Sequence, residues 1–289
     1  MSVRRLAVIG LGLIGGSFAR AVREAGEVAH VTGFDPDGVQ RQRASALGVV
    51  DEVCDSAAVA VRDADLVLLA VPVLHTADAL RSCIGALKHG AIVSDVGSTK
   101  QSVLRDVAGV CGGLPPWFVA AHPIAGTEKS GVANSIATLF RGHRVILTPH
   151  AGQDDTARQA VAALWQAVGA RVVEMDAAQH DAIFAATSHL PHVLAYSFVD
   201  MLDRLEHSDN IFPNAGGGFR DFTRIASSSP QMWHDIVRAN ADAVGRLLDR
   251  QIDELQQIRQ MMRDARWDDM RAVFERARGV RERYLSQIE

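Results

Sequence analysis

A glycine-rich segment near the N-terminus constrains the fold of this chain more than any other feature. Residues 6–9 form a short apolar run of the buried-strand type, and Gly10-Leu11-Gly12-Leu13-Ile14-Gly15 follows it directly. A helical pattern with apolar residues on one face begins immediately afterwards. Glycines at this spacing between a strand and a helix are typical of a dinucleotide-binding turn, where a pyrophosphate approaches the backbone at a helix N-terminus. We therefore expect cofactor contacts from Gly10, Gly12, Leu13, Ile14 and Gly15.

An acidic residue at the end of the second expected strand indicates which cofactor is bound. Residues 30–34 have strand character and lead into Asp35, 20 residues after Gly15. A carboxylate at this position accepts hydrogen bonds from both ribose hydroxyls of the adenosine, and it would repel a 2′-phosphate. Residues 36–38 supply no Arg or Lys to offset that repulsion, so the sequence predicts NAD in preference to NADP. The alternative interpretation of Asp35 is a helix-capping residue before Pro36.

Strand and helix patterns continue to alternate up to about residue 176. Apolar runs that resemble strands lie at residues 66–71, 91–95, 144–147 and 171–175, with a helical pattern over 154–168. This alternation predicts an α/β fold with a doubly wound parallel sheet of the Rossmann type, whose ligands lie at the carboxyl ends of the strands. Val71 and Pro72 stand at one such end, and we expect them to line the cofactor site.

After Met175 the strand patterns stop and the rest of the chain is helical in period. One helical pattern runs from Ala177 to about Leu205, and Pro191 is expected to kink it. One or two long helices with apolar residues at roughly heptad spacing follow from Pro230 onward. We therefore predict two domains, residues 1–176 for NAD binding and residues 177–289 as an all-α domain. The apolar stripes of the C-terminal helices favour a homodimer.

Composition excludes several other classes of protein. Of the 289 residues 48% are hydrophobic and 22% are charged, and the net charge of −4 gives no basic surface for nucleic acid. The three cysteines match neither a disulfide framework nor a zinc spacing, and the pair His189 and His192 lacks a third ligand, so no metal is expected. The longest apolar run, residues 66–74, is too short to span a membrane, and the N-terminus leaves no room for a signal peptide. We expect a cytoplasmic protein that contacts no membrane.

The segment His122-Pro123-Ile124-Ala125-Gly126-Thr127-Glu128-Lys129-Ser130-Gly131 is the strongest candidate for chemistry. It brings an imidazole, two hydroxyls and both signs of charge directly after an apolar run at 117–121. A surface loop with a chance histidine is the alternative interpretation. However, Asp35, Ser98 and His122 all follow expected strands, and the carboxyl ends of parallel strands meet at one edge of a sheet. That convergence favours a functional role for His122.

Five motifs, taken together, resemble the prephenate/arogenate dehydrogenases of tyrosine biosynthesis. They are GLGLIGGS (10–17), DVGSTK (95–100), HPIAGTEKSG (122–131), SHLPH (188–192) and GGGFRDFTRIA (216–226). The first occurs in many dehydrogenases, whereas the other four in this order are far more specific. The resemblance covers nearly the whole chain and implies a Rossmann-type domain followed by an all-helical domain that forms a homodimer. It also implies NAD-dependent oxidative decarboxylation of a cyclohexadienol, giving 4-hydroxyphenylpyruvate from prephenate or tyrosine from arogenate.

The same resemblance implies roles for individual residues. His122 would accept the proton of the ring hydroxyl, and Ser98 would orient both this histidine and that hydroxyl. The residues implied to shape the substrate pocket are Arg224, His192, Thr127, Glu128, Asp221 and Trp233. Because the ring carboxylate must leave as neutral CO₂, a tight ion pair to it would stabilise the ground state, so we expect Arg224 to bind the side-chain carboxylate instead. A structural ion pair between Arg224 and Asp221 is the alternative, and the two roles are compatible.

Two other functions compete with this interpretation. A β-hydroxyacid dehydrogenase or imine reductase also joins a Rossmann domain to a helical one, but those hydroxyacid enzymes use a catalytic lysine after the Rossmann domain. No Lys follows Lys129 in this chain, which argues against that class. A non-catalytic NAD-binding regulator would need Asp35 and the glycines, but it would have no use for His122, Ser98 and Arg224 together.

Overall fold

The computed structural model describes residues 3–127, 129–206 and 208–288. The chain forms two compact units, Met1–Ala241 and Asp242–Glu289. The first unit contains both β-sheets and every residue that the sequence nominated for a functional site.

The larger sheet has six parallel strands in the order β3-β2-β1-β4-β5-β6. Its strands are β1 (Arg5–Ile9), β2 (His30–Phe34), β3 (Glu52–Val53), β4 (Leu66–Leu69), β5 (Ile92–Asp95) and β6 (Phe118–Val119). The helices between them are α1 (Leu13–Glu24), α2 (Gly38–Ala46), α3 (Ala57–Val61), α4 (Thr76–Cys83) and α5 (Lys100–Cys111). The strand order reverses direction between β1 and β4, which creates the crevice where doubly wound sheets bind ligands. The predicted fold class is confirmed.

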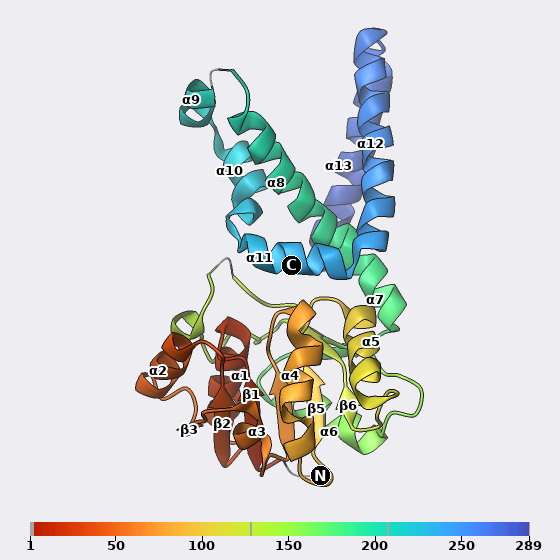
Figure 1. Cartoon of the computed structure of the whole chain (residues 1–289). Helices are drawn as coiled ribbons and strands as arrows, with labels where there is room; N and C mark the ends of the chain where they lie inside the picture. The colour runs from red at the N-terminus through yellow and green to blue at the C-terminus, as the bar shows by residue number, and fades with distance from the viewer. Residues whose placement is uncertain (1–2, 128, 207, 289) are drawn as a thin grey trace. The chain divides into compact units, whose positions relative to one another are not determined.

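Alternate residues of the central strands enter two separate cores, one on each face of this sheet. Leu6 and Val8 of β1 pack in one cluster with the apolar face of α1, including Phe18. Ala7 and Ile9 pack in the other cluster with residues of α3, α4 and α5. Figure 1 shows α4 and α5 side by side over the second face. Burial of both faces explains why these strands are continuous apolar runs in the sequence.

A second, three-stranded sheet departs from the sequence-based prediction of one doubly wound sheet. It consists of β7 (Ala121–Pro123), β8 (Arg144–Leu147) and β9 (Arg171–Glu174), with β7 antiparallel to β8 and α6 (Asp155–Ala167) connecting β8 to β9. The chain leaves the larger sheet after Val119, so His122 lies within β7, opposite Ile146, and not beyond the end of a parallel strand. The expected convergence of strand ends is therefore wrong for His122. Periodicity cannot reveal this, because it does not specify which strand a short apolar run pairs with.

The predicted helix from Ala177 is interrupted next to the segment 188–192, where Pro191 was expected to kink it. It comprises α7 (Ala177–Phe184), a π-helical turn over Ala185–His189, and α8 (Leu190–Asp203). Pro191 lies in the first turn of α8, directly after this π-helical turn. A proline cannot donate to the carbonyl one turn earlier and clashes with it, so a disturbance over residues 185–189 is expected. Widened turns of this kind are frequent at functional sites.

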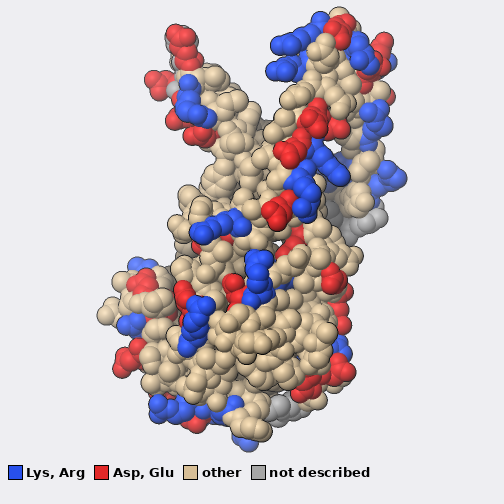
Figure 2. Space-filling view, turned by 45° about the vertical axis from the view of Figure 1, so that its right-hand side comes forward, with Lys and Arg blue, Asp and Glu red and all other residues tan. Residues whose placement is uncertain are grey.

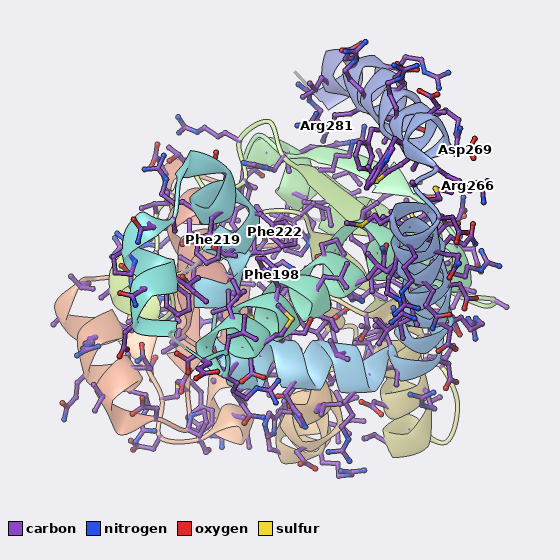
Figure 3. The ribbon with its side chains drawn as sticks, turned by 90° about the horizontal axis from the view of Figure 1, so that it is seen from above. Phe198, Phe219, Phe222, Arg266, Asp269 and Arg281 are labelled. Atoms are coloured by element: carbon purple, nitrogen blue, oxygen red, sulfur yellow. The ribbon has the colours of Figure 1, made fainter. Side chains whose placement is uncertain are left out.

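Short helices complete the first unit. They are α9 (Ser208–Ile211), α10 (Gly217–Thr223), a 3₁₀ turn over Arg224–Ser227, and α11 (Pro230–Ala239). Phe198 of α8 packs against Phe219 and Phe222 of α10, with ring centroids 6.2 and 5.6 Å apart, and Figure 3 shows the three rings together. Trp233 and Ile236 of α11 enter the core on the α3–α5 face of the larger sheet.

The second unit consists of two long helices, α12 (Ala241–Arg263) and α13 (Trp267–Ile288). Large apolar side chains remain exposed on both helices, and they are Ile252, Leu255, Met262, Trp267, Phe274, Val280 and Tyr284. The start of α13 carries an ion pair between Arg266 and Asp269, both labelled in Figure 3. The boundary predicted between residues 176 and 177 stays a prediction, because residues 177–241 are grouped here with the N-terminal sheets.

Candidate active site

The glycine-rich turn has the geometry that a dinucleotide requires. Gly10 has φ +104°, and a Cβ there would lie 2.3 Å from the carbonyl oxygen of Ala70. A Cβ on Gly15 would lie 2.1 Å from the carbonyl oxygen of Gly10, so α1 and β1 approach closely only because this residue is glycine. Gly12 is the N-cap of α1, no side chain caps the helix, and the space around its Cβ position is open for 4 Å. The first turn of α1 is therefore accessible to phosphate oxygens.

Asp35 lies directly after β2 and is anchored to this turn. Its Oδ2 accepts a hydrogen bond from the backbone N–H of Leu11 at 2.7 Å, and its Oδ1 accepts one from the N–H of Asp37 at 2.9 Å. Burial raises the pKa of Asp35, and these two N–H groups oppose that shift. The N-cap of α2 is Asp37, whose side chain accepts from the N–H of Val39, so capping does not explain Asp35. Ribose binding by Asp35 stays a prediction.

Arg41 is a neighbour of Asp35 that the sequence argument did not consider. Its guanidinium Nη1 donates to the carbonyl oxygen of Asp35 at 2.6 Å, and the group lies 5.7 Å from the centre of the Phe34 ring. Residues 36–38 carry no cation, but Arg41 follows three residues after Gly38. Because α2 brings residue 41 back toward the end of β2, one positive charge does lie beside the expected ribose site.

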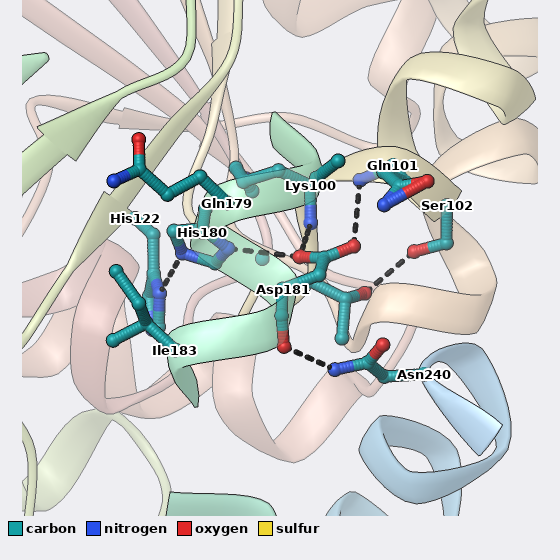
Figure 4. Close-up of polar contacts among 12 residues, drawn as sticks. Lys100, Gln101, Ser102, His122, Gln179, His180, Asp181, Ile183 and Asn240 are labelled. Atoms are coloured by element: carbon teal, nitrogen blue, oxygen red, sulfur yellow. Dashed lines mark hydrogen bonds and ion pairs between the residues drawn. The ribbon is translucent and has the colours of Figure 1, made fainter. Parts of the chain in front are cut away.

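His122 is buried in β7 and belongs to a chain of hydrogen bonds that ends on a helix N-terminus. Its Nδ1 is 2.8 Å from Nε2 of His180, and Nδ1 of His180 is 2.8 Å from Oδ1 of Asp181. The Asp181 carboxylate also accepts the backbone N–H groups of Lys100 at 2.7 Å and Gln101 at 3.0 Å. Figure 4 shows this connection from β7 through α7 to α5. Among the described residues, Nε2 of His122 has no hydrogen-bond partner.

A buried ion pair holds the backbone next to His122. Lys100 is fully buried, and its Nζ contacts Oδ2 of Asp95 at 2.6 Å and the carbonyl oxygen of Ala121 at 2.6 Å. Oδ1 of Asp95 accepts the N–H of Ala121 at 3.0 Å. The backbone C=O of Ala121 thus accepts from Lys100, and its N–H donates to Asp95. The DVGSTK motif therefore positions the strand that carries His122.

Burial and nearby positive charge keep His122 neutral. Burial lowers the pKa of His122 well below its usual value, and His180, Lys100 and His189 lower it further. Burial also lowers the pKa of His180, against the opposing effect of Asp181. For His189 burial lowers the pKa to about 4. At neutral pH His122 is therefore an uncharged imidazole and can accept a proton.

Among the described residues no hydrogen bond joins Ser98 to His122, and the orienting role predicted for Ser98 stays a prediction. Ser98 is half-buried just before α5, and Nδ1 of His122 is bound by His180. A contact between Ser98 and a substrate hydroxyl stays a prediction.

Two of the nominated substrate residues lie against each other in the first unit. The rings of His192 and Trp233 stack with centroids 3.3 Å apart and planes 18° apart. Burial lowers the pKa of His192, and the positive charge of Arg224 lowers it further. The indole N–H of Trp233 is buried without a protein partner among the described residues. An apolar cavity of about 460 Å³ adjoins the pair, lined in part by His192, Tyr196, Pro230, Trp233 and Val237.

Of the remaining nominated residues, Asp221, Thr127 and Pro72 are exposed and Val71 is half-buried. Asp221 has an ion pair with Arg220 at 3.9 Å, and this pair, not one with Arg224, is the ion pair described for it. The hydroxyl of Thr127 accepts the N–H of Lys129 at 3.2 Å. Val71 and Pro72 follow β4 beside Gly10. Glu128 lies outside the described residues.

Comparison with known proteins assigns the family. Residues 18–174 match the family model for the prephenate dehydrogenase nucleotide-binding domain, and residues 176–276 match that for the prephenate dehydrogenase dimerization domain. The chain is 40% identical over 259 residues to a cyclohexadienyl dehydrogenase of Zymomonas mobilis, covering 89% of this chain and 87% of that protein. The chain belongs to the prephenate dehydrogenase family.

Two further family members support the assignment. A prephenate dehydrogenase of Bacillus subtilis is 38% identical over 280 residues, covering 94% of this chain and 74% of that protein. The crystal structure of a prephenate dehydrogenase from Aquifex aeolicus, in complex with hydroxyphenyl propionate and NAD+, is 33% identical with a TM-score of 0.90, and 97% of this chain and 98% of that chain are covered. The predicted family and the prediction of an oxidoreductase are both confirmed.

Sequence reasoning about this family member missed His180, Asp181 and Lys100. One signal was present, because His180-Asp181 is an adjacent polar pair in a segment otherwise rich in Ala, Ile and Phe. Polar residues on an apolar helix face usually need buried partners. Their partners on β7 and α5, however, are remote in sequence and could not be named from periodicity.

Proposed function

We propose that this protein catalyses the oxidative decarboxylation of prephenate, arogenate or both, with His122 as the proton acceptor. The observation that carries the proposal is a buried, neutral imidazole bound by a protein partner at Nδ1 and available at Nε2. A base of this kind suits a substrate hydroxyl that becomes acidic as its carbon loses hydride.

NAD is the cofactor. The N-terminal residues match a nucleotide-binding family model, and the Aquifex aeolicus relative was crystallised with NAD+. The open N-terminus of α1 and the tight turn at Gly10 fit a pyrophosphate, and Asp35 fits a ribose. When bound, the nicotinamide supplies an acceptor for hydride.

The side chains of this protein then accept and return the proton of the substrate hydroxyl. The C–H bond of the ring carbinol releases its electron pair as hydride, and His122 accepts the hydroxyl proton at Nε2. The bond to the ring carboxylate breaks as CO₂ leaves, and its electron pair completes the aromatic ring. The proton held by His122 returns to the phenolic oxygen, so the balance is loss of one hydride and one CO₂.

Turnover with each substrate and cofactor tests this proposal directly. NADH formation at 340 nm is measured with prephenate and with arogenate, each with NAD and with NADP. Turnover of either cyclohexadienol supports the proposal and identifies the preferred substrate. Protein that binds NAD and turns over neither compound would contradict it.

Arg224 is proposed to bind the side-chain carboxylate of the substrate. Arg224 is exposed, and its positive charge lowers the pKa of His192. The ion pair described for Asp221 is with Arg220 and not with Arg224. Arg224→Ala should therefore raise KM about 10- to 100-fold, the effect of losing a charged hydrogen bond, with a smaller fall in kcat. Arg220→Ala, which removes an exposed cation on the same segment, is the control. A large loss of kcat at unchanged KM would refute this role.

Asp35 is proposed to set the preference for NAD. We expect wild-type kcat/KM to be higher with NAD than with NADP, because the carboxylate repels a 2′-phosphate. Asp35→Ala should lower kcat/KM with NAD about tenfold or more, since charged hydrogen bonds are lost, and should improve NADP because Arg41 then faces the phosphate. Asp37→Ala removes only the cap of α2 and serves as the control. Wild-type protein that prefers NADP would disprove this assignment.

We also propose a cytoplasmic homodimer formed through the C-terminal helices. Residues 176–276 match a model named for dimerization, and apolar side chains are exposed on α12 and α13. One segment, Ala177–Asp203, is long and apolar enough by composition to cross a bilayer, but a core or interface helix meets the same criteria. That segment carries the buried pair His180 and Asp181, whose partners come from β7 and α5 and not from lipid. On the face shown in Figure 2, charged side chains of both signs are interspersed.

A further inference from the structure

We propose that His180 and Asp181 are positioning residues that hold His122 in the tautomer protonated at Nδ1, so that Nε2 is the nitrogen that receives the substrate proton. This inference rests on the proposed function of His122 as the base. It gives a role to His180 and Asp181, two residues of α7 that belong to none of the five sequence motifs. The geometry that carries it is the linear order of three side chains, His122, His180 and Asp181.

The order of donors and acceptors starts at Asp181. Its carboxylate accepts two backbone N–H groups from the first turn of α5, where the helix dipole favours a negative charge. An ionised carboxylate can only accept hydrogen bonds, so Nδ1 of His180 must carry the proton in the bond between them. Those two N–H groups and His180 also lower the pKa of Asp181 despite its burial. The first bond of the chain therefore has one possible direction.

The second bond follows from the first. A neutral His180 that is protonated at Nδ1 has only a lone pair at Nε2, so Nδ1 of His122 must donate to it. A neutral His122 protonated at Nδ1 has its own lone pair at Nε2, which has no protein partner among the described residues. If His180 donated instead, Nε2 of His122 would carry the proton and could not act as a base. Asp181 thus determines which nitrogen of His122 is protonated, through two successive hydrogen bonds.

The surrounding charges oppose the competing protonation states. His122 is faced by His180 and His189 from the helical segment and by Lys100 from α5, and all three disfavour a positive charge on it. His180 is influenced by Lys100, Asp95 and Asp181, and burial outweighs the two carboxylates. A resting pair of neutral imidazoles is therefore favoured. When His122 takes the proton, its Nδ1–H still donates to His180, with the Asp181 carboxylate behind it.

The framework that holds Asp181 is itself constrained from a third element. Nδ2 of Asn240, at the end of α11, donates to the backbone carbonyl of Asp181 at 2.8 Å. Nδ2 of Asn240 is also 3.2 Å from Nδ1 of His189. The position of α7 relative to β7 is thus fixed by polar contacts at several points, as a positioning role requires.

The tautomer is measured first, in the wild-type protein without substrate. Two-dimensional ¹⁵N–¹H correlation spectra of the histidine rings distinguish a protonated from an unprotonated ring nitrogen, and the His122→Asn spectrum assigns the His122 signals. We expect Nδ1 of both His122 and His180 to be protonated at neutral pH. A His122 protonated at Nε2, or a doubly protonated His180, would overturn the inference. Wild-type protein with the expected tautomer but no turnover would count against the proposed function alone.

Variant kinetics provide the second measurement. His180→Phe should lower kcat about tenfold or more, part of the about 10²–10⁴-fold contribution of a general base, at nearly unchanged KM. His180→Gln should recover part of the loss, because its amide oxygen can accept from Nδ1 of His122. His143→Phe alters an exposed histidine outside this hydrogen-bond chain and should leave kcat within about twofold of wild type. Equal losses in the His180 and His143 variants, or an unchanged kcat in His180→Phe, would overturn the inference.

Discussion

His122→Asn should lower kcat by about 10²–10⁴-fold, the usual contribution of a positioned general base. Asparagine suits this test because its amide nitrogen can still donate to Nε2 of His180, as Nδ1 of the histidine is proposed to do. The basic nitrogen at the Nε2 position is the group removed. Stopped-flow or steady-state measurement of NADH formation gives kcat and KM for the variant and the wild type.

The affinity for NAD provides the internal control for this variant. Dissociation constants from calorimetry should be unchanged within about twofold, since Asp35 and the glycine-rich turn are left intact. His143→Asn, which alters an exposed histidine, should behave as wild type in both assays. If His122→Asn retains the wild-type kcat, another group must accept the proton, and the proposed mechanism is wrong.

Lys100→Met should destabilise the protein by about 3–5 kcal/mol, the effect of removing one partner from a buried ion pair. Methionine fills a similar volume, so the variant removes the charge and leaves little cavity. Asp95 would then keep a buried negative charge without its cation, and the carbonyl of Ala121 would lose its donor. Denaturant unfolding followed by circular dichroism measures the change in the free energy of unfolding.

Two further variants separate this effect from a general loss of charge. Arg141→Met breaks the exposed pair of Arg141 with Glu24, 2.8 Å apart, and should cost no more than about 1 kcal/mol. Asp95→Asn combined with Lys100→Met leaves neither charge buried and should be more stable than Lys100→Met alone. If the double variant is less stable than either single variant, charge burial is not the reason for the destabilisation.

Local patterns allowed several parts of the site to be predicted. Gly10, Gly12 and Gly15 were recognisable because the turn needs residues without side chains at fixed positions next to a strand and a helix. Asp35 was recognisable because one helix, one turn and one strand separate it from those glycines. His122 was nominated by its dense polar neighbourhood, and the structure places it in β7 with a buried ring.

The same patterns were misleading where the structure depends on which strands and helices pair with each other. Strand periodicity at 144–147 and 171–175 suggested more strands of one sheet, whereas those segments form a second sheet with β7. Pro191 suggested a kink within residues 188–192 but not its form, which is a π-helical turn over Ala185–His189. Arg41 was missed because the turn of α2 brings it back beside Asp35.

By itself, the sequence determined the Rossmann-type fold class, the nucleotide-binding turn and the family, because each depends on residues that are close together in the chain. Only the tertiary structure decided which groups surround His122. His122 and His180 are 58 residues apart, and Lys100 and Asp181 are 81 apart. Buried polar groups need hydrogen-bond partners, and the folded chain supplies these from segments remote in sequence. The local periodicity of the sequence does not indicate which remote segments meet. The orientation of the proposed base is therefore a property of the packing of β7, α5 and α7.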